Sequence, residues 1–255
     1  MNDVAVATKE KSTYKKHEPY GIYEKYFKRP LDLLCGVLAV VVFCWLYAIV
    51  ALLVRIKLGS PVLFTQDRPG KDEKIFKLYK FRTMTDQRDA DGDLLPDEVR
   101  LTKFGKLLRK TSLDELPEAF NIIRGDMSVV GPRPQLVKDM VFMTAEQRKR
   151  HAVRPGLSGL AQTRGRNAMS WDEKLATDLE YIEKITFVGD CKIVVDTVKQ
   201  VFFKQKGLQT IESDSRYIDE VEITDDLGDY LLESGRVTED EYEKKQTEAK
   251  QLLGV

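Results

Sequence analysis

The sequence has little of what several common enzyme classes depend on. Only three cysteines and two histidines occur among 255 residues, which argues against a zinc site and against a Ser-His triad. An odd number of cysteines, two of them inside an apolar run, argues against a disulfide framework and for a reducing compartment. No Gly-x-Ser-x-Gly, Walker or Gly-x-Gly-x-x-Gly motif is present. The usual signatures of hydrolases and dehydrogenases are therefore missing.

The chain also has no net charge, because 41 Lys and Arg residues balance 41 Asp and Glu residues. The balance hides a split: residues 211–255 hold 14 acidic and 5 basic side chains, so this part carries −9 and the remainder +9. A basic body favours an anionic ligand or membrane surface. With 42% hydrophobic and 32% charged residues, the composition excludes wholesale disorder, a collagen-like fibre and a polytopic membrane protein.

One long hydrophobic run follows a polar, flexible leader of residues 1–20. Leu33 to Val54 are 22 consecutive uncharged residues. As a helix this run is about 33 Å long, which is enough for the hydrocarbon core of a bilayer. A cleavable signal peptide is disfavoured because the run is too long and no cleavage site follows. We predict a membrane-inserted helix within residues 21–58.

Positive charges flank both ends of this run: Lys25, Lys28 and Arg29 precede it, and Arg55 and Lys57 follow it. Positive charge marks the cytoplasmic side of a membrane segment. A single span cannot obey that rule at both ends, whereas a segment that enters and returns on the same face can. The charges favour a re-entrant helix, and the length favours a spanning one.

Residues 59–207 are predicted to form a small α/β domain. Strands are expected at Val62–Gln66 and Ile75–Met84, with a turn at Arg68-Pro69-Gly70 between them. Asp86–Asp97 predicts a solvated acidic loop, since it lacks the closing glutamate and the glycine spacing of a calcium loop.

Helices are expected in the second half of this domain. Apolar residues at three- and four-residue steps predict a helix from Leu113 to Ile123, which Gly125 ends. Between two later helices we expect an irregular, glycine-rich stretch from Arg154 to Asn167. Capping boxes predict the starts of those two helices, at Thr144-x-x-Gln147 and Ser170-x-x-Glu173.

Two further segments have strongly charged faces. Val188–Lys206 predicts a basic amphipathic helix, which either lies on an anionic membrane or packs on the core. Residues 208–255 predict an acidic tail with a helical hairpin, whose second helix starts at the capping box Thr238-x-x-Glu241 and runs to about Leu253. This tail resembles the short C-terminal helical modules of many bacterial proteins. It is either an interaction or oligomerisation element or a solvated acidic hairpin.

The strongest candidate for catalytic side chains is the segment Ser112-Leu113-Asp114-Glu115-Leu116-Pro117. A carboxylate in the first turn of a helix stays ionised, and the same helix end can receive a phosphate. Adjacent carboxylates on a helix point roughly 100° apart, so one could bind a metal while the other attacks or polarises. Carboxylates, arginines and glycines are the side-chain set of phosphate chemistry with magnesium. The alternative is that Ser112-x-x-Glu115 is a capping box and Asp114 only complements the dipole.

Several cations are candidate phosphate ligands. Arg133 lies between Pro132 and Pro134, which fix the backbone on either side of a guanidinium suited to a bidentate phosphate contact. The same Gly and Pro residues also fit a surface turn. The remaining candidates are Lys80 and Arg82 on a strand, Arg154, and Arg166 with Asn167.

Taken together, these motifs resemble the bacterial sugar transferases called monotopic phosphoglycosyl transferases, over roughly Tyr23 to Gly207. The motifs occur in the order of that family, and the short length looks like its minimal members. One departure is Phe43-Cys44-Trp45-Leu46, where members carry a helix-breaking Ser-Pro pair. After the apolar run, the motifs are Phe64–Gly70, Tyr79–Met84, Leu113–Leu116, Gly125–Ser128, Val130–Pro134, Arg154–Gly156 and Gly165–Ala168.

The resemblance implies transfer of a sugar-1-phosphate from a UDP-sugar to a polyprenyl (undecaprenyl) phosphate at the cytoplasmic face of the bacterial inner membrane, initiating a lipid-linked glycan. It implies that Asp114 is the nucleophile, that Glu115 belongs to a Mg²⁺ site with it, and that UMP leaves. Arg133 and Arg166 are implied to hold phosphates or the nucleotide. Membrane lipids are expected partners and nucleic acid is not. Downstream glycosyltransferases and a second copy of the chain are further expected partners.

Two other functions stay open. The chain could be a membrane-tethered scaffold that keeps the fold and only recruits glycosyltransferases, or a metal-dependent phosphatase acting on polyprenyl diphosphates. Intact Asp114, Glu115, Arg133 and Arg166 argue against the scaffold. Dependence on a UDP-sugar would separate the phosphatase. The sugar itself has no readable code in the sequence.

Overall fold

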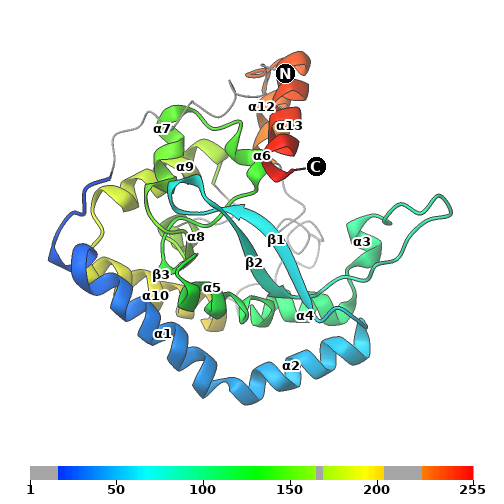
Figure 1. Ribbon diagram of the computed structural model, residues 1–255, viewed down its shortest axis with the longest axis horizontal. Coiled ribbons are helices and arrows are strands. Elements are labelled where there is room, and N and C mark those ends of the chain that lie inside the picture. The colour runs from blue at the N-terminus through cyan, green and yellow to red at the C-terminus, as the bar shows by residue number, and fades with distance from the viewer. Residues whose placement is uncertain (1–16, 165–168, 204–225, 255) are drawn as a thin grey trace, which may run out of the picture.

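The strands of this protein form two separate two-stranded sheets, with helices on every side of them (Figure 1). The fold is that of a computed structural model, in which residues 17–164, 169–203 and 226–254 are described. The mixture of helices and strands confirms the expected combination of the two. Most of the predicted leader lies outside the described residues.

Helices, strands and short 3-10 turns are interspersed along the chain. The first half comprises the π-helix η1 Tyr23–Phe27, α1 Lys28–Val42, α2 Cys44–Lys57, β1 Leu63–Pro69, the 3-10 turn η2 Lys71–Glu73, β2 Ile75–Phe81, α3 Asp97–Arg100, α4 Lys103–Lys110, the 3-10 turn η3 Leu113–Glu115 and α5 Glu118–Arg124. The second half comprises β3 Ser128–Val130, α6 Val137–Met140, α7 Ala145–Arg148, the 3-10 turn η4 Lys149–Ala152, β4 Gly156–Ser158, α8 Leu160–Arg164, α9 Trp171–Glu183, α10 Phe187–Phe203, α12 Leu227–Glu233 and α13 Glu239–Leu253.

The strands β1 and β2 confirm the two predicted strands and pair antiparallel, although β2 ends at Phe81 and not at the predicted Met84. Leu63 pairs with Phe81 at one end and Pro69 with Ile75 at the other. Leu78 and Phe81 are buried on the side that faces the core. The first strand runs through Pro69, so the turn begins at Gly70, two residues later than expected.

An ionic contact holds the tip of this hairpin. Glu73 has a positive φ of 60° and accepts hydrogen bonds from Nε and Nη2 of Arg148, both at 2.7 Å. Burial opposes the charged form of Glu73, but His151 and Arg148 outweigh it and lower the pKa of this carboxyl to about 2. His151 is itself buried, with Nδ1 3.7 Å from Glu73, and burial lowers its pKa to about 4. The hairpin tip is thereby attached to α7 and η4.

The strands β3 and β4 pair in parallel, inside a stretch that the sequence predicts to be irregular. The prediction for Arg154–Asn167 is wrong in this part, because β4 and α8 both lie within it. Three-residue strands are too short to show an alternating pattern. The backbones of these two segments also approach each other very closely. A Cβ on Gly156 would lie 2.0 Å from the nitrogen of Gly131, so only glycine fits there.

The long apolar run is divided into two helices at Phe43, which has φ −100° and ψ 14°. Among the described residues no single helix is long and apolar enough to cross a bilayer. The helical segments Tyr23–Val42 and Cys44–Lys57, bent by 65° relative to each other, are together long and apolar enough to do so. The run is therefore broken rather than straight, and the choice between a re-entrant segment, which the flanking charges favour, and a bent span stays a prediction.

The bend needs no proline because each limb is fixed to the body by its own polar contact. In α1, Asp32 accepts hydrogen bonds from Oγ of Ser128 at 2.8 Å and from the nitrogen of Val129 at 3.0 Å. In α2, the hydroxyl of Tyr47 donates to the carbonyl of Leu116 at 2.5 Å. The partners in these contacts lie between 69 and 97 residues apart in the sequence, so a local pattern does not reveal them.

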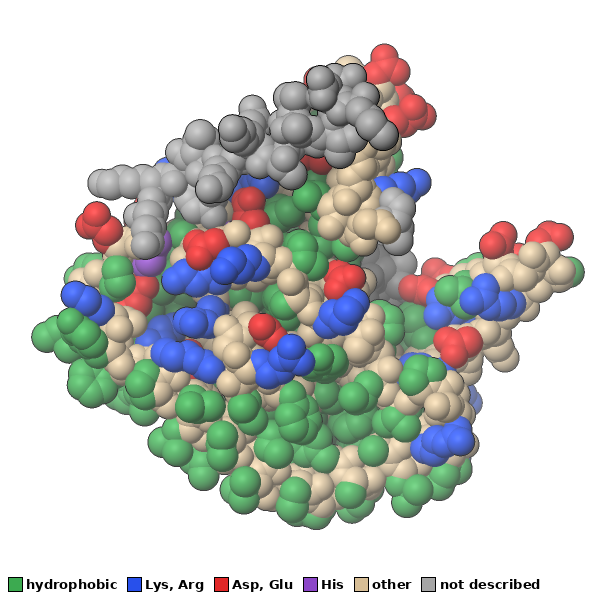
Figure 2. Space-filling view, viewed as in Figure 1, with side chains coloured by type: hydrophobic (Ala, Val, Ile, Leu, Met, Phe, Trp, Pro, Cys, Tyr) green, Lys and Arg blue, Asp and Glu red, His purple; other side chains and the backbone are tan. Residues whose placement is uncertain are grey.

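The outer sides of the two limbs are apolar (Figure 2). In that view, green hydrophobic side chains cover the lower edge of the molecule, where Figure 1 places α1 and α2, and a row of Lys and Arg side chains lies above them. The exposed side chains of the two helices are Leu33, Leu34, Val37, Leu38, Val41, Val42, Trp45, Ile49, Leu52, Leu53 and Ile56, with Phe43 between the helices.

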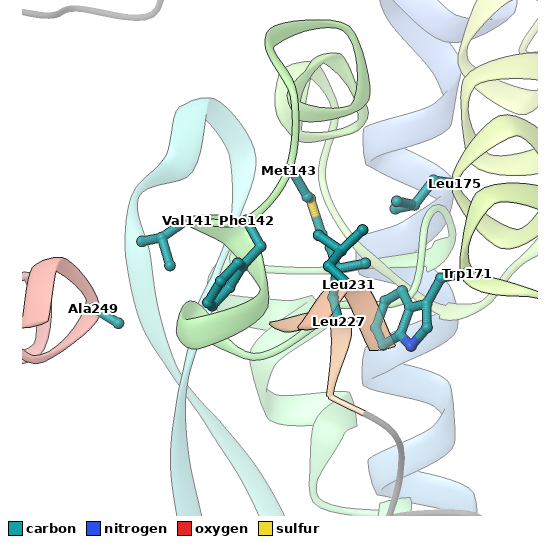
Figure 3. Packing of buried hydrophobic residues seen from close by; sticks show 8 residues of the cluster. All are labelled: Val141, Phe142, Met143, Trp171, Leu175, Leu227, Leu231 and Ala249. Carbon is teal, nitrogen blue, oxygen red and sulfur yellow. The ribbon is translucent and has the colours of Figure 1, made fainter. Parts of the chain in front are cut away.

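The described part of the predicted tail packs on the body of the protein (Figure 3). Leu227 and Leu231 of α12 and Ala249 of α13 share one hydrophobic cluster with Phe142 and Trp171. This packing contradicts the alternative of a solvated hairpin. Polar contacts also join the tail to the body. The nitrogen of Leu227 donates to Oδ1 of Asp139, and Lys138 and Arg236 form salt bridges with Asp226 and Asp172.

The predicted helix ends are mostly confirmed. The capping boxes at Thr144, Ser170 and Thr238 all form, and Gly125 ends α5 with a φ of 95°. The last body helix, α10, exposes Phe187, Val188, Val194, Val195 and Val198. Its predicted end beyond Phe203 lies outside the described residues.

Candidate active site

Asp114 and Glu115 lie in the short 3-10 turn η3, which precedes α5. The predicted capping box is wrong here: Ser112 is left-handed, with φ 55°, and makes no side-chain cap. Because α5 begins only at Glu118, Asp114 is not in the first turn of an α-helix. Complementing a helix dipole therefore does not explain this buried carboxyl, which is 5% exposed.

The turn is held in place by the apolar residues on either side of the carboxyl pair. Leu113 and Leu116 pack against Val54 of α2, Phe81 of β2 and Leu108 of α4. The hydroxyl of Tyr47 also binds the carbonyl of Leu116. The position of Asp114 is thus set by the same helix, α2, that carries part of the exposed apolar surface.

Glu115 is the meeting point of two cations from distant parts of the chain. Its Oε1 accepts a hydrogen bond from Nη2 of Arg133 at 2.9 Å and from Nζ of Lys80 at 3.3 Å. Lys80 is buried, and its Nζ also lies 3.8 Å from Oε1 of Glu118. The structure therefore brings together four of the predicted site residues: Lys80, Asp114, Glu115 and Arg133.

The charges of this group shift two pKa values in opposite directions. Burial opposes the charged form of Glu115, but Arg133 and Lys80 outweigh it and hold the pKa of that carboxyl well below its usual range. Burial raises the pKa of Glu118, and the charge of Glu115 raises it further. Asp114 contributes to the same upward shift, which places its carboxyl within electrostatic reach of Glu118. Glu118 therefore holds a proton more readily than Glu115.

A small pocket opens beside these residues, lined by Arg68, Leu78, Lys80, Glu118, Arg133 and Pro134. Arg68 and Glu118 are the two residues of the site that sequence reasoning missed. Arg68 donates to the carbonyl of Pro134 at 3.1 Å, which joins β1 to the Arg133 segment. It lies within the Phe64–Gly70 motif, and Glu118 lies one turn beyond Glu115, so both signals were present.

Two predicted phosphate ligands have contacts of a different kind. Arg82 binds the carbonyls of Leu58 and Ser60 and, at 2.6 Å, the carboxylate of Asp86, so it fastens the end of α2 to β2. Arg154 donates through Nε to the carbonyl of Gly125 at 2.8 Å, at the end of α5.

The last two predicted ligands, Arg166 and Asn167, lie outside the described residues. The phosphate-binding roles of Arg82, Arg154, Arg166 and Asn167 stay predictions.

The donor atoms at Asp114 and Glu115 suit Mg²⁺ better than a softer metal, because both are carboxylate oxygens. Within the parts of the chain that the structure describes, no group of three or more His, Cys, Asp or Glu side chains surrounds a common point. Mg²⁺ commonly takes only one or two protein carboxylates and completes its shell with waters and substrate phosphates. The residues present fit that mode of binding.

A buried and a half-buried carboxylate beside clustered cations are typical of enzymes that act on anionic, phosphate-bearing substrates. The family model of the bacterial sugar transferases matches residues 23–204, and the chain belongs to that family. The match covers both the bent helix pair and the candidate site. It confirms the resemblance inferred from the motifs.

Curated relatives align with most of this region. The uncharacterized sugar transferase EpsL of Bacillus subtilis is 53% identical over 157 residues, covering 62% of this chain and 78% of EpsL. The UDP-glucose:undecaprenyl-phosphate glucose-1-phosphate transferase of Caulobacter vibrioides is 36% identical over 181 residues, covering 67% of this chain and 68% of that enzyme. A UDP-N-acetylgalactosamine-undecaprenyl-phosphate N-acetylgalactosaminephosphotransferase of Aeromonas hydrophila is 36% identical over 194 residues, covering 72% of this chain but only 45% of the relative.

Proposed function

We propose that this protein transfers a sugar-1-phosphate from a UDP-sugar to undecaprenyl phosphate, releasing UMP. The observation that carries the proposal is the buried Asp114 beside the Lys80–Glu115–Arg133 contacts. The names of the Caulobacter and Aeromonas relatives support the reaction class. They carry different sugars, glucose and N-acetylgalactosamine, so they leave the sugar of this protein to experiment.

The transfer proceeds in two displacements at the phosphorus next to the sugar. A carboxylate oxygen of Asp114 attacks that phosphorus, the bond to the UMP oxygen breaks, and the sugar phosphate remains on Asp114 as an acyl phosphate. An oxygen of undecaprenyl phosphate then attacks the same phosphorus, which releases the Asp114 carboxylate and leaves an undecaprenyl diphosphate sugar. Two separate steps allow two anionic phosphates to visit one small site in turn.

The cations of the pocket make an attack by one anion on another feasible. Arg68, Lys80 and Arg133 surround the space beside Glu115 and Glu118, and fixed cations stabilise charge that develops on transferring phosphoryl oxygens. Asp114 and Glu115 would hold Mg²⁺, which when bound supplies further neutralisation of phosphate charge. Arg82, Arg154, Arg166 and Asn167 are proposed to contact the nucleotide or the lipid phosphate.

We further propose that the bent helix pair enters the cytoplasmic face of the inner membrane and returns to it. The support is the exposed apolar surface of α1 and α2, together with the basic residues at both of its ends. The apolar side of α10 would lie on the same membrane surface. Since α2 also fixes the Asp114 turn, this arrangement would keep the nucleophile near the lipid phosphate.

The test is UMP release by the purified protein in lipid nanodiscs, with undecaprenyl phosphate and a panel of UDP-sugars. We expect UMP with at least one donor, in step with formation of the lipid-linked product. A membrane scaffold would release no UMP with any donor. A phosphatase would release inorganic phosphate from undecaprenyl diphosphate without a nucleotide sugar. Either result would overturn the proposal.

A further inference from the structure

A fully buried ion pair lies behind Arg133 and takes no part in the transfer chemistry. Arg150 is 2% exposed and Asp178 is 3% exposed. Both Nε and Nη2 of Arg150 donate to Oδ2 of Asp178, at 2.9 and 2.6 Å. The same Nη2 donates to the main-chain carbonyl of Arg133 at 2.6 Å.

We propose that Arg150, held by Asp178, is a positioning residue that fixes the Arg133 segment so that its guanidinium meets the substrate phosphate. This inference rests on the proposed function, in which Arg133 contacts phosphate. Pro132 and Pro134 restrict the backbone next to Arg133. The carbonyls on either side are bonded as well, that of Pro132 to the nitrogen of Gly156 at 3.0 Å and that of Pro134 to Arg68 at 3.1 Å. Arg150 holds the carbonyl of Arg133 itself, with the shortest of the three contacts.

The geometry explains why a charged pair occupies this position. A buried ion pair is weak evidence for stability, because apolar residues of similar volume are often neutral or stabilising in its place. An apolar pair would, however, leave the carbonyl of Arg133 without its donor. The planar guanidinium donates to the Asp178 carboxylate and to this carbonyl in one fixed geometry, which a lysine ammonium does less well.

The pair also links the site to the rest of the fold. Arg150 is in η4 and Asp178 is in α9, and the residues Trp171 and Leu175 of α9 belong to the hydrophobic cluster that receives the C-terminal hairpin. The guanidinium of Arg133 is thus held by Glu115. Its main-chain carbonyl is held by Arg150, which Asp178 links to α9, a helix packed in the core.

The decisive variant is Arg150→Met/Asp178→Leu, which removes both charges together and leaves no uncompensated charge. We would measure its melting temperature and its kcat and KM for UMP release from UDP-glucose and UDP-N-acetylgalactosamine, with undecaprenyl phosphate. The account predicts a folded protein that loses at least tenfold in kcat/KM. Arg150→Lys should lose activity in the same direction, and it serves as the second variant if the apolar pair fails to fold.

A double-mutant cycle with Arg133→Lys separates positioning from a structural role. If Arg150 acts through Arg133, then adding Arg150→Met/Asp178→Leu, or Arg150→Lys, to Arg133→Lys should cost less than a further twofold. Losses that multiply would overturn the proposal, as would a folded pair variant with wild-type kcat/KM. Wild-type turnover by Arg133→Gln would instead contradict the assignment of Arg133 in the proposed function.

The matched control is a second Arg–Asp pair whose aspartate lies on the same helix, α9. Arg236 and Asp172 join α9 to the tail at the surface, with both side chains nearly half exposed. Arg236→Gln/Asp172→Asn should leave kcat/KM unchanged. A tenfold loss in this control as well would mean that α9 responds to any lost contact, and would count against a specific role for Arg150.

Discussion

Two groups of charged residues in this protein are bonded in different ways. We call Lys28, Asp32 and Asp190 the anchor cluster, and Lys80, Asp114, Glu115, Glu118 and Arg133 the site cluster. In the anchor cluster, Asp190 accepts from Tyr23, Lys28 and Tyr181 at 2.6 to 2.9 Å. Asp32 likewise has a short partner for each oxygen.

The site cluster contains longer contacts. A single oxygen of Glu115 serves both Arg133 and Lys80, and Lys80 lies 3.3 Å from Glu115 and 3.8 Å from Glu118. The longer of these contacts, those of Lys80, are exchanged for phosphate oxygens at a lower cost than short ones. The difference teaches that bond geometry, rather than burial or charge alone, separates a group that holds the fold from one that is available for chemistry.

The largest effect on activity is expected at Asp114, in the site cluster. Asp114→Asn keeps the shape but removes the attacking carboxylate, so transfer should fall by at least about 10³-fold. Stability should change by no more than about 1 kcal/mol, the typical value of one neutral hydrogen bond. UMP release and thermal unfolding measure the two effects. A folded, active asparagine variant would contradict the role of Asp114.

The anchor cluster should respond in the opposite way. Asp190→Ala leaves the half-buried ammonium of Lys28 and the hydroxyls of Tyr23 and Tyr181 without their carboxylate. Breaking such an ion pair typically costs about 3–5 kcal/mol. Turnover per folded molecule should stay close to wild type. Asp196→Ala, on the same helix but beside an exposed lysine, is the control and should cost less than about 1 kcal/mol. Equal effects of the two substitutions on denaturant unfolding would remove the distinction between anchor and surface charge.

A third buried group sharpens the comparison through pH. His151 has a folded-state pKa of about 4, below its ordinary value, so the unfolded chain takes up a proton first as the pH falls. Stability is therefore fully present above about pH 6.5 and is lost between about pH 6.5 and 4, by up to about 3 kcal/mol. His151→Gln should flatten this part of the stability curve. His17→Gln, which leaves His151 in place, should retain it; equal slopes in all three proteins would show that His151 is not the group that titrates.

The smallest effect is expected where no charge is involved. Leu231 of α12 is 9% exposed in the cluster that docks the C-terminal hairpin. Leu231→Ala should cost about 2–3 kcal/mol of unfolding free energy through lost burial and a residual cavity. Leu252→Ala, at an exposed position on α13, should cost less than about 0.5 kcal/mol. Matching costs would mean that the hairpin does not stabilise the body.

Local patterns were sufficient for much of the fold. The β1–β2 hairpin, the three capping boxes and the Gly125 helix end all depend on residues within one or two turns of each other. Lys80, Asp114, Glu115 and Arg133 were likewise recognisable as candidates by residue type and motif. The meeting of Lys80 and Arg133 at one oxygen of Glu115 was not, because it depends on three separate segments of the chain.

The features that sequence reasoning missed are set by distant contacts. The bend at Phe43 follows from anchors at Ser128 and Leu116, and the β3–β4 pairing from the close approach of Gly131 and Gly156. Ser112 looked like a helix cap, yet a left-handed backbone turns its side chain away from that role. Docking of the tail depends on partners such as Phe142, which the acidic composition of the tail concealed.

The central claim is that Asp114 becomes covalently loaded, and a reaction with donor alone tests it most directly. Enzyme and the UDP-sugar selected by the panel, with Mg²⁺ and without lipid acceptor, should release up to one equivalent of UMP. Intact-protein mass spectrometry should show one added sugar phosphate, located on Asp114 and absent from Asp114→Asn. Adding undecaprenyl phosphate should discharge it. An enzyme that turns over with lipid present but releases no UMP and gains no mass without it would contradict the account.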